Sequence, residues 1–217
     1  NHAVDVESII ENVLNGFGNI TGQPTLEGHV GYNPDIDPYP YDPDEAERLV
    51  EESGHAGVEI TLQTPIGRYL RDVEIAQAAA SQIDSLSNVS CEVQQREFSS
   101  LVQDITTGNI EDKPHFNLLG WGNGEFDGSQ TMTPLMASNG ALTILKKDEL
   151  DALLNDAETT QDSEERVEIL QEANQLAHDL APWVFMHQQF SVYGVSSDIS
   201  WEPRADEFID PDTATQQ

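Results

Sequence analysis

Apolar side chains recur every three or four residues along several stretches of the chain, which is the spacing of amphipathic helices. This pattern predicts helices over residues 6–14, 44–53, 69–86, 98–105, 148–158 and 163–180. Asp5 and Asp42 stand where N-cap residues are preferred, immediately before the first two of these helices. Pro43 suits the first turn of the second helix, and Gly54 is expected to end that helix.

Between the helices, short apolar or alternating runs predict strands over residues 58–63, 89–95 and 116–121. The run 116–121 is nearly continuous in apolar residues, so we expect it to be covered on both faces. A strand pair is predicted over 183–195. Strands that alternate with helices in this way are typical of a three-layer α/β lobe.

The remaining segments differ in composition from the lobe. Residues 19–43 contain five prolines and many Gly, Asp and Tyr residues, which predicts an extended loop that wraps a surface. Residues 196–217 show little hydrophobic periodicity. We therefore expect a lobe over residues 1–195, including the loop 19–43, followed by a tail over 196–217.

Charge changes this picture most. The chain has 40 Asp and Glu residues against 9 Lys and Arg, a formal net charge of −31, and the acids are spread along its whole length. Such a surface repels itself in dilute buffer. In molar salt the Debye length falls to about 3 Å, and the same surface keeps the protein dispersed. This spread favours adaptation to high salt, and the alternative is an acidic protein of ordinary habitat.

The charge argument gives a direct prediction for stability. We expect the isolated lobe to lose cooperative unfolding below roughly molar salt, because screening of its self-repulsion then fails. Thermal melts in dilute buffer and in concentrated KCl or NaCl would measure the difference. Melts that coincide would contradict the adaptation to high salt.

Composition also excludes several classes of partner and cofactor. Nine scattered cations cannot form the basic patch that nucleic acid or an anionic membrane surface requires. No apolar stretch of about 18 residues could span a bilayer. The six histidines form no close pair, and with Cys91 as the only cysteine we expect no metal site. Nucleotide and catalytic-serine motifs are absent, so we expect no cofactor.

One loop carries candidate binding residues. Residues 120–132 follow the carboxyl end of an expected central strand, where open α/β sheets place ligands. They include Trp121, Asn123, Glu125 and Asp127. An indole face beside carboxylates suits a ligand that bears an amine or another cation. The alternative is that Trp121 belongs to the core and that Asp127 caps a helix over 129–136.

Four motifs together resemble a known family. They are Ala3-Val4-Asp5-Val6-Glu7, Tyr39-Pro40-Tyr41-Asp42-Pro43-Asp44-Glu45-Ala46, Leu119-Gly120-Trp121 with Asp127, and Ala181-Pro182-Trp183-Val184 with Trp201-Glu202-Pro203-Arg204. In order and spacing they are similar to the peptide/nickel-type solute-binding proteins of ABC importers, family 5. Some peptide-binding members carry an Asp three residues after the Trp, where it holds the peptide's amino group. Here that position is Gly124.

The resemblance implies a binding protein and no enzyme. Its fold would be the type II periplasmic-binding-protein fold, in which two lobes close on a peptide or similar small solute and deliver it to ABC permease subunits. This chain would be the carboxyl-terminal lobe, with the tail 196–217 returning toward an amino-terminal lobe. The protein would be extracytoplasmic, held to the membrane by a lipid anchor outside this chain. The alternative is an acidic, glycosidase-like extracellular hydrolase domain with paired carboxylates.

Overall fold

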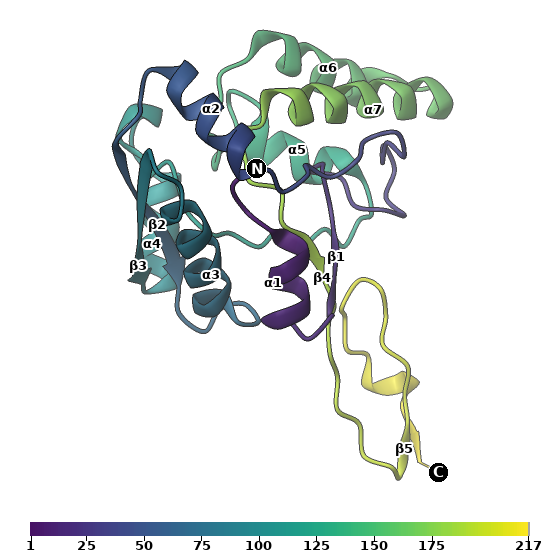
Figure 1. The fold of residues 1–217 in the computed structure, drawn as a ribbon. Helices are drawn as coiled ribbons and strands as arrows, with labels where there is room; N and C mark the ends of the chain where they lie inside the picture. Colours follow the sequence, from purple (N-terminus) through teal and green to yellow (C-terminus); the bar gives the residue numbers. More distant parts are fainter. Residues whose placement is uncertain (217) are drawn as a thin grey trace.

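A computed structural model describes residues 1–216 of the chain. Figure 1 shows two groups of elements and a tail. One group is a strand pair packed with helices, the other is a set of three helices, and the carboxyl-terminal tail extends away from both. Among residues 1–216, none of the helices combines the length and the hydropathy that a membrane span requires.

The strand pair is parallel and has a helical crossover. β2 (Val58–Pro65) pairs with β3 (Val89–Arg96) from Val58↔Val89 to Pro65↔Arg96, and α3 (Asp72–Asp84) connects them. The predicted strands 58–63 and 89–95 are thus confirmed. Cys91 lies in β3, where burial raises the pKa of its thiol.

The predicted strand over 116–121 is wrong in extent. It forms a single parallel bridge, Gln63↔Asn117, on the edge of β2 that β3 does not occupy. Gln63 N–H donates to the Phe116 carbonyl at 3.0 Å, and Leu118 N–H donates to the Gln63 carbonyl at 2.8 Å. From β3 the chain returns across β2 through α4 (Phe98–Thr106), opposite in direction to the α3 crossover. Right-handed crossovers in opposite directions place α3 and α4 on opposite faces, which gives the expected three layers.

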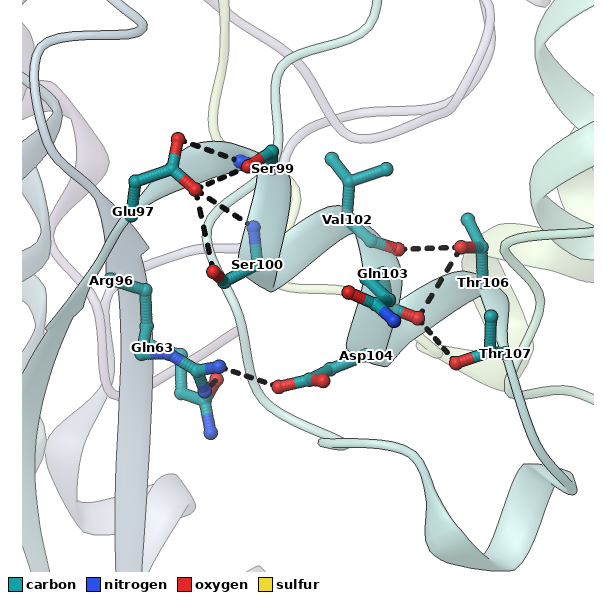
Figure 2. Close-up of polar contacts among 10 residues, drawn as sticks. All are labelled: Gln63, Arg96, Glu97, Ser99, Ser100, Val102, Gln103, Asp104, Thr106 and Thr107. Atoms are coloured by element: carbon teal, nitrogen blue, oxygen red, sulfur yellow. Dashed lines mark hydrogen bonds and ion pairs between the residues drawn. The ribbon is translucent and has the colours of Figure 1, made fainter.

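Both ends of α4 are held by side chains (Figure 2). The Glu97 carboxylate accepts the backbone N–H groups of Ser99 and Ser100 at 3.1 and 3.0 Å. Hydrogen bonds from the Ser99 hydroxyl and these amides lower the pKa of Glu97 to about 2. Arg96 forms an ion pair with Asp104 at 2.5 Å, so the helix is also tied to the end of β3. The helix therefore has a fixed position from which the chain enters 116–121.

Two hydrophobic clusters form the core. The first joins α1 (Val6–Asn12) and α3 to Leu62 of β2, with Ile9 at 1% and Ala76 at 0% exposure. The second joins α5 (Gly128–Met136), α6 (Asp148–Thr159) and α7 (Ser163–Leu180) around Met132, Leu150 and Ala173. In each cluster, the apolar faces of the helices pack against one another and are removed from water.

Most predicted helices are confirmed, including α2 (Pro43–Ser53). The Asp42 carboxylate accepts the Glu45 N–H at 3.0 Å, and Gly54 ends α2 in the left-handed conformation at φ 77°. The helix expected over 69–86 begins only at Asp72, because Arg71 has φ 57° and the Asp72 carboxylate binds the amides of the preceding turn. The helix expected to reach Leu14 ends at Asn12.

The predicted strand pair over 183–195 is wrong. Only β4 (His187–Gln189) forms there, and its antiparallel partner is β1 (Gly18–Ile20), near the start of the chain. Gly18 suits this pairing because a Cβ there would lie 3.1 Å from His187 Cδ2. The pairing depends on tertiary contact, which local periodicity does not encode.

The loop after β1 is bound to α7, whereas the carboxyl-terminal tail extends from the lobe. Residues 21–42 contain no helix or strand, and Asn174 of α7 fixes them by accepting the Thr25 N–H at 3.2 Å and donating to the Gly31 carbonyl at 2.9 Å. The tail contains β5 (Ile199–Ser200) paired with β6 (Thr215–Gln216). Figure 1 shows it projecting from the lobe, and Phe208 is 64% exposed there.

Candidate functional site

A groove with a cavity volume of about 1700 Å³ lies at one edge of the lobe. Most of its lining comes from five parts of the chain, which are residues 26–29, 68–70, 114–124, 181–193 and 203–207, and single residues such as Trp201 complete it. Residues 68–70 and 120–124 follow the carboxyl ends of β2 and of the segment bridged to it. Ligands of open α/β sheets bind at such an edge.

The groove is nearly free of the charge that covers the rest of the molecule. Of the chain's 40 Asp and Glu residues, only Glu27, Asp206 and Glu207 line it. Its aromatic lining includes Tyr69, Trp121, Trp183 and Trp201. A concave, mainly apolar surface with a few polar groups is the usual form of a small-molecule site.

Trp121 stands at this groove on a closely packed turn. Its side chain is 42% exposed, so the core alternative for Trp121 is not what the structure shows. The preceding Gly120 allows close approach, because a Cβ there would lie 2.8 Å from Tyr69 Cε1. The Tyr69 hydroxyl donates to the Gly120 carbonyl at 3.1 Å. Trp121 and the turn after β2 are therefore neighbours.

A buried carboxylate shapes the turn after β2. Asp72 is 3% exposed and accepts the N–H groups of Gly67, Arg68 and Tyr69 at 3.2, 2.7 and 3.0 Å. Burial raises the pKa of Asp72, but the hydrogen bonds from these amides and from Val73 lower it by a larger amount. The net pKa is therefore below its ordinary value. The turn is thus held by an ionised side chain.

This turn presents a cation that the sequence analysis missed. The Arg68 guanidinium lies 5.3 Å from the centre of the Tyr69 ring and 5.0 Å from that of Phe98. Within residues 1–216 it has no carboxylate or carbonyl partner. The other eight Lys and Arg residues all do: Arg48, Arg71, Arg96, Lys113, Lys146, Lys147, Arg166 and Arg204. Its position after the carboxyl end of β2 was the available signal.

Of the four residues predicted to contact ligand, Asp127 has the clearest structural role. Its carboxylate accepts the Ser129 N–H at 2.9 Å as the N-cap of α5. It also forms a two-pronged ion pair with Arg166, at 2.7 and 3.0 Å. Burial raises the pKa of Asp127, but the hydrogen bonds from Arg166 and Ser129 lower it by a larger amount. The net pKa is therefore below its ordinary value. The alternative prediction of a cap on a helix over 129–136 is confirmed.

The other two predicted residues differ in position. Asn123 lines the groove and braces its own loop, donating to the Asp127 carbonyl at 2.7 Å and to Thr131 Oγ1 at 3.1 Å. Glu125 is exposed and lies outside the groove lining, as Asp127 does. Ligand contact by these residues stays a prediction, and the groove geometry favours Trp121 and Asn123.

Comparison with curated proteins finds relatives that are named as binding proteins. The chain is 28% identical over 196 residues to heme-binding protein A of Haemophilus influenzae, covering 85% of this chain and 34% of that protein. It is 26% identical over 168 residues to di/tripeptide-binding protein 4 of Pseudomonas aeruginosa, covering 74% of this chain and 30% of the relative. The chain therefore spans about a third of the length of these relatives.

Comparison with solved structures gives the fold. A dipeptide-binding protein of Pseudoalteromonas sp. SM9913, in complex with Met-Leu, matches with a TM-score of 0.84 at 21% identity, over 100% of this chain and 44% of that one. The expected type II periplasmic-binding-protein fold is thus confirmed. The sequence profile described as "Bacterial extracellular solute-binding proteins, family 5 Middle" matches residues 1–142. The chain belongs to family 5 of the extracellular solute-binding proteins.

Proposed function

We propose that this chain is the carboxyl-terminal lobe of an extracytoplasmic solute-binding protein that captures peptides or a similar small solute for an ABC importer. The lobe spans residues 1–195, and delivery to permease subunits follows closure of a second lobe over the groove. The observation that carries the proposal is the groove itself, which Trp121 and the unpaired Arg68 both line and which contains few acids. Attachment at the cell surface by a lipid anchor outside this chain, and a habitat of high salt, are parts of the same proposal.

The tail fits the proposal as the return toward an amino-terminal lobe. Phe208 and Ile209 of the tail are 64% and 61% exposed, which is unusual for side chains of this size. An apolar surface of this kind marks a place where another part of a protein docks. Residues 196–217 would cover it by packing on the amino-terminal lobe.

The chemistry of the groove indicates a ligand with an anionic group. The Arg68 guanidinium lies 5.3 and 5.0 Å from the centres of two aromatic rings, which hold it in place, and its N–H groups suit a carboxylate. In a chain with 40 acids, a groove cation without an acidic partner is available to a ligand. Peptides with a free carboxyl terminus have such a group.

Isothermal titration of the full-length protein in molar salt against di-, tri- and oligopeptides tests the function. We expect Arg68→Gln to weaken binding of a free peptide roughly 10- to 100-fold, since a charge-assisted pair of hydrogen bonds is lost. The carboxyl-terminal amide of the same peptide should bind both proteins with nearly equal affinity. The absence of heat with every peptide would remove the peptide assignment, whereas binding unchanged by Arg68→Gln would remove only the role of Arg68.

A further inference from the structure

Residues 26–30 form a second wall of the groove beside the Trp121 loop. Residues 26–29 line the groove, and Val30 makes a parallel bridge to Asp127. Val30 N–H donates to the Phe126 carbonyl at 2.9 Å, and Gly128 N–H donates to the Val30 carbonyl at 2.9 Å. The rings of His29 and Phe126 meet edge to face with centroids 5.3 Å apart. The wall and the loop are therefore held in register with each other.

The far side of this wall is fixed to α7. Gly31 has φ 88°, and a Cβ there would lie 2.5 Å from Leu170 Cβ, so the chain turns directly against the helix. The Asn174 side chain donates to the Gly31 carbonyl at 2.9 Å. Glu27 thus projects from a segment that is anchored on both sides, although the segment has no regular secondary structure.

Glu27 is the groove carboxylate without an internal partner. Of the three acids in the lining, Asp206 accepts hydrogen bonds from Arg204, the first at 2.8 Å, and Glu207 accepts one from Ser191. Glu27 is exposed and accepts no hydrogen bond and forms no ion pair within the part of the chain from 1 to 216. On the neighbouring loop, the Asp127 carboxylate is already paired with Arg166, and Glu125 lies outside the groove lining.

We propose that Glu27 is the cation-binding residue of the groove, and that its carboxylate binds an ammonium group of the solute, such as the amino terminus of a peptide. This deepens the proposed function and depends on it. The general acidity of the surface cannot replace such a contact, because exposed charges more than about 3 Å apart are screened from each other in molar salt. A direct, hydrogen-bonded pair persists under these conditions. Together with Arg68, Glu27 gives the groove one free group of each sign.

Titration calorimetry of the full-length protein with Met-Leu and tri-alanine, each with a free or an acetylated amino terminus, tests the assignment. Acetylation removes the ammonium charge and leaves the carboxylate for Arg68. We expect acetylation to weaken binding to the unaltered protein about 10-fold or more. Glu27→Gln should weaken binding of the free peptide by a similar factor and should leave the acetylated peptide unaffected, so that discrimination between them disappears.

Two further variants sharpen the result. Glu168→Gln makes the same charge change on an exposed position of α7 outside the groove, and it should retain full discrimination. Glu125→Gln tests the competing carboxylate of the Trp121 loop. Discrimination retained in Glu27→Gln, or lost in Glu125→Gln instead, would overturn the role of Glu27 while the proposed function stands. An unaltered protein that binds the free and acetylated forms equally would overturn it as well, and one that binds none of the peptides would overturn both proposals.

Discussion

Replacement of Asp72 by alanine is expected to lower the free energy of unfolding by about 2–4 kcal/mol, because it removes a buried acceptor shared by several backbone amides. The same change frees the turn that carries Arg68 and Tyr69. In the variant, binding must first order the Arg68 and Tyr69 side chains, and this entropic cost should weaken the affinity for a free peptide roughly 10-fold. Denaturant unfolding and titration calorimetry in molar salt measure the two effects.

The matched control lies on the same helix. Asp84 at the other end of α3 is exposed and accepts a single amide, that of Cys91, at 3.0 Å. Asp84→Ala should cost no more than about 1 kcal/mol and leave peptide affinity unchanged. Equal losses of stability in both variants would contradict the special role of Asp72.

The pKa of Asp72 gives this prediction a pH dependence. Because the folded pKa lies below its ordinary value, the carboxylate stabilises the fold at neutral pH. That contribution is lost as the pH falls through the folded pKa. The difference in stability between the unaltered protein and Asp72→Ala should therefore shrink in acid, and a difference that grows in acid would contradict the assignment.

Removal of the Arg166 guanidinium is the second change with a large expected effect. Its side chain is 23% exposed and that of Asp127 is 22% exposed, so the pair is largely buried. Arg166 also donates to the Ala157 carbonyl at 2.9 Å and therefore joins α5, α6 and α7. Arg166→Ala leaves the Asp127 carboxylate without its partner, and we expect a loss of about 2–3 kcal/mol in the free energy of unfolding.

A comparison of two ion pairs tests this expectation in thermal melts. For a chain of this size each kcal/mol lowers the melting temperature by roughly 2–4 °C. Arg96 is paired with Asp104 (Figure 2). The Asp104 side chain is 47% exposed, and Arg96→Ala should cost less than about 1 kcal/mol. If Arg166→Ala melts no lower than Arg96→Ala, the pair at Asp127 is not the link between the helices that its geometry indicates.

The carboxylates of the Trp121 loop have a different role in the structure from the one that the sequence indicated. From the residue types of the loop, Glu125 and Asp127 were expected to bind a cationic ligand. In the fold, Asp127 is bound to Arg166, whose place 39 residues later in the chain gives no local sign of the pairing. The groove instead presents Arg68 and Glu27, which come from two other parts of the chain.

Local sequence was sufficient to predict most of the helices, the N-caps Asp5 and Asp42, and the charge of the surface. Asp42, Pro43 and Gly54 bound α2 as expected, because capping and left-handed termination depend on neighbouring residues only. The pairing of β1 with β4, and the distinction between paired and free charged groups, emerge only in the folded chain. Both depend on contacts between residues far apart in the chain, and a pattern of hydrophobic and polar positions carries no information about which distant residues meet.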